Sequence, residues 1–396
     1  MGERKEKKEM LIPFLFLSFL SFLSFLPSAN RGYHPFMKLA LVADWLTVFG
    51  GAEHAVAEFH RLWPEAPIFT TVANRGNIGP LADADIRTSR LQPWYRIVRR
   101  HQLLLPWMPR AVEDIDLRGY DVILSSSHAV GKGIIPPQTA RHICYCHTPM
   151  RYAWEMEETY LEDFGVPRIL RPKIKRMLAQ LRRWDLQTAK RVDRFIANST
   201  ETQRRIQRIY ARDSVVIPPP VEDRFFASVM QPAQGRAGYL AIGRLVPYKK
   251  FDLLIALANE LKLPLTIAGR GQEEAMLRRM AGPTVTFLGF VPDEKLPELY
   301  ASAKAVLFPP HEDAGIVPLE AQACGTPVIA FGSGGALDTV KDGETGVFFK
   351  EQTVASMADA IQRFGSLAFD PEKIRDHARQ FSAERFRERI RSEVER

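Results

Sequence analysis

Residues 305–330 read AVLFPPHEDAGIVPLEAQACGTPVIA. The first four residues are apolar, as in a buried parallel strand, and the residues after them form a loop that contains Glu312 and Gly315. We expect a helix to begin near Val317–Pro318, because proline is tolerated in the first turn of a helix. A second apolar run over 327–330 follows. The stretch therefore predicts a strand, a loop, a helix and a second strand, which is the repeating unit of a parallel sheet.

The same unit recurs on both sides of this stretch. Ligands of such sheets bind beyond the carboxyl ends of the strands. The alternation stops at a segment rich in Pro, Gly, Gln and Ala that ends at Gly238, and then it restarts. The sequence therefore predicts an α/β protein with two Rossmann-like parallel-sheet domains facing an interdomain cleft. The other apolar runs that we interpret as strands occupy residues 38–43, 121–124, 142–145, 194–197, 239–242, 265–268 and 284–288.

We divide the chain at these changes in pattern. Residues 37–217 are the first domain, 218–238 are a linker, and 239–375 are the second domain. Residues 376–396 are a charged helix, either a solvated tail or a helix that packs back across the first domain.

Residues 1–36 differ from the rest of the chain. Leu11–Pro27 is almost entirely apolar and resembles the hydrophobic region of a signal peptide, but it is short for a membrane span and no clean cleavage site follows. We favour the interpretation that translation starts at Met37, or that the segment is a dispensable anchor, over export.

The composition is that of a folded protein, with 46% hydrophobic and 25% charged residues. Three cysteines exclude a disulfide scaffold, and the pair Cys144 and Cys146 lacks the second pair that a zinc site needs, so we expect no metal. Lys and Arg outnumber Asp and Glu by 54 to 46, which gives a net charge of +8. That excess favours anionic partners. No recognised nucleic-acid-binding module is present, so we do not expect nucleic acid among them.

Two glutamates and the start of the predicted helix are the candidate binding groups within residues 305–330. Glu312 lies in the loop and Glu320 about one turn into the helix. The free amides of Ile316 and Val317 at the start of that helix are suited to a phosphate. Carboxylates on either side of a diphosphate can accept hydrogen bonds from the vicinal hydroxyls of sugars. The alternative is that Glu312 is a solvated loop acid and Glu320 a capping residue.

The string resembles the Glu-x7-Glu motif of retaining glycosyltransferases of family 4, which have the two-domain GT-B fold. The resemblance extends from Met37 to the C-terminus. It implies that residues 37–217 are the acceptor-side domain and that residues 239–375 are the nucleotide-sugar-binding domain. It implies that Glu312 binds the hydroxyls of the donor sugar and that Glu320 binds the ribose. An aromatic residue is common in the family where this chain has Ala314, a departure that bears on local packing and not on the carboxylates.

The resemblance also implies a site for the donor diphosphate. Arg244 ends a predicted strand and Lys249 follows five residues later; arginine and lysine suit a diphosphate as a fork and a point charge. Gly51, in the Gly-Gly loop after the first strand, would complete this site with the amides of Ile316 and Val317. The alternatives are a solvated basic loop for Arg244 and Lys249 and a tight turn for the glycine loop.

Three further residues are assigned in the same way. His147 follows a predicted strand, and the resemblance implies that its ring or carbonyl lies near the C6 hydroxyl of the sugar, which makes it a catalytic candidate beside Glu312. Val291 and Asp293 belong to a loop that lies against the nucleobase in the family. An acid there suits guanine, hence a GDP donor. The alternatives are a structural histidine and a helix N-cap.

The segment 150–154 resembles mannosyltransferases of lipopolysaccharide and exopolysaccharide assembly. Two basic stretches without acids, 86–112 and 166–184, suit an anionic membrane surface, with a solvated face as the alternative. We therefore expect a retaining, metal-independent hexosyltransferase that moves mannose from GDP-mannose to a lipid-linked or polysaccharide acceptor. It would need no cofactor besides the nucleotide sugar and would lie in the cytoplasm, peripherally on the inner face of the plasma membrane. The alternatives are a UDP-sugar-dependent enzyme of the same fold, a non-catalytic sugar-nucleotide-binding protein and an epimerase.

Overall fold

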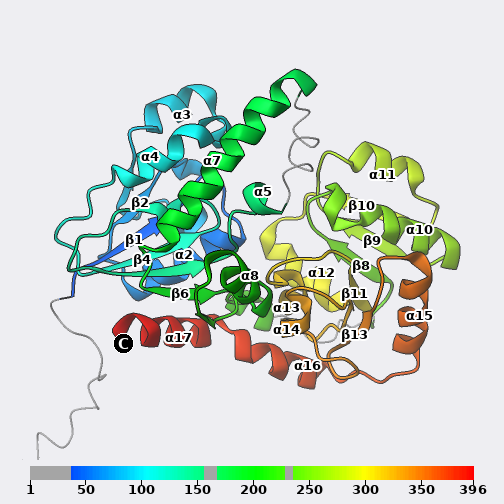
Figure 1. Ribbon diagram of the computed structural model, residues 1–396. Coiled ribbons are helices and arrows are strands. Elements are labelled where there is room, and N and C mark those ends of the chain that lie inside the picture. The colour runs from blue at the N-terminus through cyan, green and yellow to red at the C-terminus, as the bar shows by residue number, and fades with distance from the viewer. Residues whose placement is uncertain (1–36, 156–166, 228–234) are drawn as a thin grey trace, which may run out of the picture. The chain divides into compact units, whose positions relative to one another are not determined.

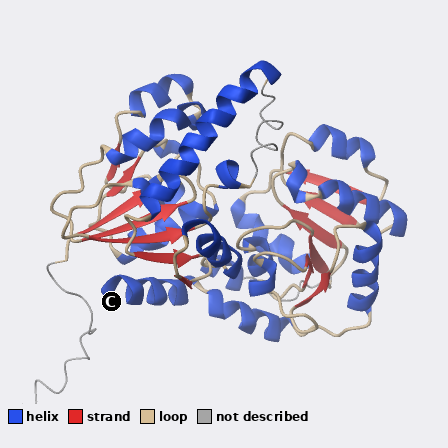
Figure 2. Cartoon of the chain, in the orientation of Figure 1, coloured by secondary structure: helices blue, strands red, loops and turns tan. Residues whose placement is uncertain are grey.

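The computed structural model describes residues 37–155, 167–227 and 235–396. Residues 38–394 form one compact unit that contains two parallel β-sheets, each lying between helices (Figures 1 and 2). The predicted N-terminal extension, residues 1–36, lies outside the described residues.

The first sheet has seven strands in the order β3-β2-β1-β4-β5-β6-β7, and every pairing is parallel. Its central strands are buried on both faces, which explains why they read as continuous apolar runs. The strands are β1 Leu39–Ala43, β2 Ile68–Thr70, β3 Ile86–Thr88, β4 Val122–Ser127, β5 Arg141–Cys146, β6 Arg194–Ala197 and β7 Ser214–Val216.

The second sheet has six parallel strands in the order β10-β9-β8-β11-β12-β13. Side chains of one strand alternate between its two faces: Tyr239 and Ala241 belong to one hydrophobic core, and Leu240 belongs to the other. The strands are β8 Tyr239–Ile242, β9 Leu265–Ala268, β10 Val285–Gly289, β11 Ala305–Phe308, β12 Val328–Phe331 and β13 Gly346–Phe349.

Both sheets reverse their strand order at one place, between β1 and β4 in the first and between β8 and β11 in the second. In open parallel sheets ligands bind at this switch point, outside the carboxyl ends of the strands. The loops after these four strands are therefore where a site is expected. The prediction of two Rossmann-like parallel-sheet domains is confirmed.

Helices connect the strands. The N-terminal half contains α2 Gly51–Leu62, α3 Gln92–Val98, α4 Met108–Glu113, α5 Arg151–Trp154, α7 Arg171–Ala189, α8 Thr200–Tyr210 and α9 Asp223–Phe226. The C-terminal half contains α10 Phe251–Leu261, α11 Glu274–Met280, α12 Leu296–Ser302, α13 Ile316–Ala323, α14 Ala336–Thr339, α15 Val354–Gly365, α16 Pro371–Ala378 and α17 Ala383–Glu395.

The last helix, α17, contacts the first sheet and its helix α2, although it follows the second sheet in sequence (Figure 1). Phe386 stacks on Phe59 with ring centroids 5.8 Å apart and meets Tyr145 edge to face at 5.6 Å. Arg387 pairs with Glu58 of α2. The apolar face of this charged helix is therefore buried against the N-terminal half.

Most strand positions agree with the apolar runs to within a few residues. Four strands were not expected: β13, and the strands β2, β3 and β7, which have only three residues each and give little periodicity. The helix expected near Val317 begins one residue earlier, at Ile316. No helix in the described part of the chain is long and apolar enough to cross a bilayer.

Candidate active site

A cavity of about 330 Å³ lies at the carboxyl ends of strands from both sheets. Its volume is within the range of small-molecule sites. Loops after β1, β5, β6, β8 and β11 contribute to its wall, as expected for a ligand site of two facing parallel sheets. The lining residues are Gly51, Ala52, His147, Thr148, Arg151, Asn198, Pro219, Tyr248, Lys249, Glu312, Asp313, Ala314, Gly315, Ile316 and Val317.

Glu312 and Lys249 form an ion pair across this cavity. Their side chains are 18% and 12% exposed, so each charge has little water and depends on the other. The sequence assigned the carboxylate to the sugar and the ammonium to the diphosphate. A donor bound in that way would exchange the Lys249–Glu312 pair for contacts of each group with the ligand.

The N-terminus of α13 opens into the same cavity. Gly315 precedes the helix with φ 62°, a left-handed conformation that favours glycine. The helix then begins at Ile316, so the amides of Ile316 and Val317 are at its positive end. A Cβ on Gly51 would lie 3.0 Å from Cδ1 of Ile316, so the glycine loop packs closely against the first residue of α13.

A second glycine loop supports the Glu312 segment from behind. The amide of Gly335 donates to the carbonyl of Glu312 at 2.8 Å. A Cβ on Gly335 would lie 2.5 Å from the carbonyl oxygen of Asp313, closer than real Cβ atoms approach. The loop after β12 therefore packs backbone on backbone against the loop after β11, and only glycine permits this approach.

Hydrogen bonds of the ring and of the backbone hold His147 in place. Its Nε2 lies 2.8 Å from Oγ of Ser126, and its carbonyl accepts from Oγ1 of Thr202 at 3.0 Å. Burial, with the nearby His128 charge as a smaller cause, lowers the pKa of His147 to about 3. The imidazole is therefore uncharged near neutral pH and is suited to hydrogen bonding with a sugar hydroxyl.

An aspartate that the sequence analysis did not select organises the loops behind His147. Asp44 follows β1, is 1% exposed, and accepts from the amide of His128 at 2.7 Å and from Oγ of Ser127 at 3.1 Å. Its carboxylate also lies 2.8 Å from Nδ1 of His128. Burial alone would raise the pKa of Asp44, but the contacts with His128 outweigh it and lower the pKa to about 2.

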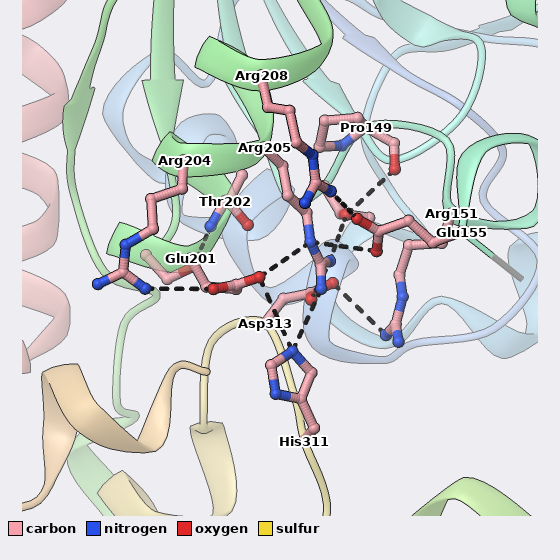
Figure 3. A network of polar contacts seen from close by, with 12 residues as sticks. Pro149, Arg151, Glu155, Glu201, Thr202, Arg204, Arg205, Arg208, His311 and Asp313 are labelled. Atoms are coloured by element: carbon pink, nitrogen blue, oxygen red, sulfur yellow. Dashed lines mark hydrogen bonds and ion pairs between the residues drawn. The ribbon is translucent and has the colours of Figure 1, made fainter. Parts of the chain in front are cut away.

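Arg205 of α8 is the centre of a polar network that reaches the Glu312 loop (Figure 3). It is 3% exposed and contacts the carboxylates of Glu155 and Glu201 at 3.2 Å each. It also pairs with Asp313, and its Nη2 lies 3.4 Å from Nε2 of His311. The network thus ties both neighbours of Glu312 to the N-terminal half of the chain.

Two further contacts reinforce this link. Arg151 lies 3.6 Å from the second oxygen of Asp313. The backbone amide of Thr200, at the start of α8, donates to Asp338 of α14 at 2.7 Å. Sequence reasoning missed the residues of this network, because nothing in the spacing of Arg205 and Asp313 indicates that they meet.

Glu320 lies on α13 and accepts from the hydroxyl of Tyr300 at 2.7 Å. Burial raises the pKa of Glu320 to about 7, although the hydrogen bond from Tyr300 opposes the shift. The group therefore titrates in the neutral range and binds hydroxyls best as a carboxylate, above that pKa.

The other predicted donor residues lie outside the cavity lining formed by the described residues. Arg244 is connected to it through Tyr248, whose hydroxyl lies 3.4 Å from Nη2 of Arg244. Asp293 is in a short 3-10 helix and lies 3.6 Å from Nη2 of Arg224. Val291 is half-buried beside it. The carboxylate of Asp293 raises the pKa of Glu320 slightly, so these two predicted base- and ribose-binding acids are within electrostatic reach of each other.

Each half of the chain matches a known protein family. Residues 49–225 match the family "Glycosyltransferase Family 4", and residues 228–381 match the family "Glycosyl transferases group 1". The chain joins a glycosyltransferase family 4 domain to a glycosyl transferases group 1 domain. The cavity that contains Glu312 and His147 is therefore built from both glycosyltransferase domains.

Curated relatives match about half of this chain. A D-inositol 3-phosphate glycosyltransferase of Nocardia farcinica is 31% identical over 212 residues, which are 46% of this chain and 46% of the relative. A GDP-mannose-dependent alpha-(1-6)-phosphatidylinositol monomannoside mannosyltransferase of Mycolicibacterium smegmatis is 35% identical over 184 residues, 40% of this chain and 47% of the relative. The chain thus spans about half the length of the curated relatives that it matches.

Solved structures show the fold over most of the chain. Anabaena Alr3699/HepE in complex with UDP and glucose has a TM-score of 0.65 at 18% identity, covering 90% of this chain and 99% of that one. Sucrose-phosphate synthase from Thermosynechococcus elongatus has a TM-score of 0.63 at 21% identity, covering 89% and 97%. The two glycosyltransferase domains therefore have the GT-B fold.

Proposed function

We propose that the protein is a retaining glycosyltransferase that moves a hexose, mannose from GDP-mannose, to a lipid-linked or polysaccharide acceptor. The observation that carries this proposal is the single cavity lined by Glu312, Lys249, His147, Gly51 and the start of α13. These residues were assigned from sequence to one donor, and they come from strand ends of both sheets. The GDP-mannose dependence of the Mycolicibacterium smegmatis relative supports the choice of donor.

In this proposal the second domain binds the donor and neutralises the leaving group. Lys249, Arg244 and the amides of Ile316 and Val317 face the diphosphate. These two side chains and the helix end neutralise the charge of the leaving group, and the proposal gives no metal this role. Glu320 binds the ribose, and Val291 and Asp293 contact the base.

The bond to the leaving group breaks at C1 of the sugar, and its electron pair leaves with the nucleoside diphosphate. Glu312 and His147 hold the sugar hydroxyls while positive charge develops at C1. The acceptor oxygen bonds to C1 on the face that the diphosphate leaves, which retains the configuration. The acceptor's proton passes to the departing phosphate oxygen.

We further propose that the protein acts in the cytoplasm in peripheral contact with the inner face of the plasma membrane, in lipopolysaccharide or other polysaccharide assembly. The stretch 86–112 supports this contact, because it contains six arginines, no acid and exposed aromatic residues.

The test is the variant Glu312→Ala assayed with GDP-mannose and a panel of other sugar nucleotides. We expect kcat to fall by about 10²–10³-fold, because a group that stabilises the transition state is removed. The control is Glu344→Ala, because this side chain is 73% exposed and is not among the residues that line the cavity, so activity should be unchanged.

Near-normal turnover in Glu312→Ala would contradict the proposal. Thermal stabilisation by UDP and not by GDP would replace the donor by a UDP-sugar, as in the UDP complexes of the Anabaena neighbour. Donor binding without transfer would indicate a binding protein, and an epimerised donor would indicate an epimerase.

A further inference from the structure

A second and larger cavity lies in the N-terminal half of the chain, with a volume of about 1300 Å³. Its wall is formed by the loop after β1, by residues near β2 and β3, and by α3 with the segment that follows it. None of the residues that the structure places in this wall is shared with the wall of the active-site cavity. The volume is sufficient for a sugar carrying a phosphate or diphosphate, since drug-sized ligands fill about 300–1,000 Å³.

The wall of this cavity is positively charged. Arg75, Arg96, Arg99 and Arg100 line it, and the part of the wall that the structure describes contains no carboxylate. Arg75 donates to the backbone carbonyls of Ala82 and Ala84. The charge of this wall is therefore not compensated by an acid within it, which favours an anionic ligand.

Three of these arginines are available to a ligand. Arg96, Arg99 and Arg100 are exposed, and among the described residues none of them has an ion pair or a side-chain hydrogen bond. Guanidinium groups bind phosphate oxygens through two parallel hydrogen bonds. Asn74 and Asn77 add side-chain amides to the wall, and these can bind sugar hydroxyls.

The cavity is close to the active site through one short loop. Thr47 and Val48 line the large cavity, and Gly51 lines the active-site cavity. Because Val48 and Gly51 are three residues apart, their Cα atoms lie within about 11 Å. The walls of the two cavities are therefore adjacent at this loop.

A row of rings connects the same two places. His101 lines the large cavity and stacks on Trp45 at 4.5 Å, and Trp45 meets His128 edge to face at 4.8 Å. His128 in turn lies 6.2 Å from His147 of the active-site cavity. Ring contacts therefore run from the large cavity to the active-site cavity.

Exposed apolar residues adjoin the arginines. Trp94 and Ile97 of α3 are 62% and 74% exposed, and Leu103 and Trp107 of the following 3-10 segment are 59% and 60% exposed. Apolar and aromatic side chains interspersed with arginines are typical of segments that enter the interface of an anionic bilayer. The cavity therefore lies beside a surface suited to a membrane.

We propose that this arginine-lined cavity binds the phosphate or diphosphate group of the acceptor. The inference rests on the proposed function: it specifies an acceptor whose sugar is linked through a phosphate ester. Arg96, Arg99 and Arg100 hold the phosphate oxygens, the sugar extends past Val48 towards Glu312, and the exposed apolar residues contact the bilayer that contains a lipid-linked acceptor.

The test compares two double variants in the presence of saturating GDP, which occupies the donor site. Arg96→Ala/Arg100→Ala removes two charges from the cavity. Arg279→Ala/Lys350→Ala removes two exposed charges from the second domain and is the matched control. Binding is measured to phosphatidylcholine vesicles containing undecaprenyl diphosphate, to vesicles with the same charge supplied by phosphatidylglycerol, and to inorganic pyrophosphate.

We expect the cavity variant to bind the undecaprenyl diphosphate vesicles at least about tenfold more weakly than the wild type, and the control to bind them normally. If pyrophosphate binds as tightly as these vesicles and is weakened equally, the phosphate comes from a soluble acceptor. If only the vesicles bind, it comes from a lipid. Both results support the proposal.

Unchanged binding in the cavity variant would overturn the proposal, and so would an equal loss on phosphatidylglycerol vesicles, which would show general attraction to an anionic surface. The thermal shift with GDP separates this outcome from failure of the proposed function. A wild-type protein that binds no nucleotide would contradict the glycosyltransferase proposal, whereas a cavity variant that keeps its GDP shift and loses only diphosphate binding locates the defect in the cavity.

Discussion

The two sheets have the same strand order around their switch points, but their loops at the carboxyl ends are held by different interactions. In the first sheet a buried carboxylate, Asp44, accepts hydrogen bonds from the loop after β4. In the second sheet the loops after β11 and β12 pack backbone on backbone, because Gly335 has no side chain. The first arrangement depends on a charge and its protonation, and the second depends on shape.

The two halves should therefore respond differently to pH and to substitutions that add atoms. A carboxylate whose partners are amides and an imidazole loses its interactions when it is protonated. Close packing of glycine backbone is insensitive to pH but tolerates no added atom. Arg205 joins the two halves and depends on both, since it pairs with Asp313 of the shape-determined loop. Substitutions at Arg205, Asp44 and Gly335 test this comparison.

The largest expected effect on stability is that of Arg205→Met. It leaves Glu155, Glu201 and Asp313 without their shared cation, and removing one partner of a buried ion network costs about 3–4 kcal/mol. Urea unfolding measures the loss. The neighbouring Arg204→Met is the control, because that side chain is 66% exposed and should change the free energy of unfolding by less than about 0.5 kcal/mol.

A double-mutant cycle with Asp313→Asn then tests whether the two residues act together. We expect a coupling energy above about 0.5 kcal/mol. Additive effects would show that Arg205 does not hold the Glu312 loop through Asp313.

The next effect is that of Asp44→Asn, which replaces an acceptor by a group that places donors against the amides of His128 and Ala129. We expect a loss of about 2–3 kcal/mol in the free energy of unfolding. The pKa of Asp44 is lowered to about 2, below its ordinary value of 3.8. Its contribution to stability is therefore present above about pH 4 and is lost as the pH falls towards 2.

Asp116→Asn is the control for burial. Hydrogen bonds from Arg118 also lower the pKa of Asp116 to about 2, but its side chain is 58% exposed. We expect almost no change in stability from this variant, measured by the same acid and urea titrations. An equal loss at both positions would show that the buried setting of Asp44 is not what stabilises the first loop.

Gly335→Ala should cost about 2 kcal/mol, because the added methyl group meets the backbone of Asp313 and Ala314. The loss should be independent of pH, in contrast to that of Asp44→Asn. Gly365→Ala is the matched control, since a Cβ there meets nothing within 4 Å and alanine is favoured in a helix. If Gly335→Ala leaves the free energy of unfolding unchanged, close backbone packing does not hold these two loops together.

The smallest expected effect is on nucleotide binding by Glu320, and it rests on the proposed ribose contact. The pKa of Glu320 is raised to about 7, so its hydroxyl-accepting carboxylate forms as the pH rises through that value. Affinity for GDP, measured by calorimetry, should increase up to about tenfold between about pH 6 and pH 8. Glu320→Gln should remove this pH dependence, and a dependence that persists in that variant would exclude Glu320 as its source.

Much of the fold follows from local sequence, because alternating apolar runs and helices determine a parallel sheet and place the strand ends at one edge. Glu312, Ile316 and Val317 were identifiable because loop, glycine and helix start are adjacent in the chain. The strands β2, β3 and β7 were missed because three residues are too few to show periodicity. Asp44 could have been selected, since it follows β1 as directly as the other candidates follow their strands.

The sequence by itself therefore determined two Rossmann-like sheets and the strand ends that carry chemistry. The tertiary structure decided which of those ends meet and which charges compensate one another. Asp44 and His128 are 84 residues apart and Arg205 and Asp313 are 108 apart, so no local pattern relates them. The pairing of Lys249 with Glu312, and the acid-free wall of the large cavity, likewise arise only when separate loops are packed together. Local periodicity encodes elements, whereas the environment of a charge depends on what the folded chain places beside it.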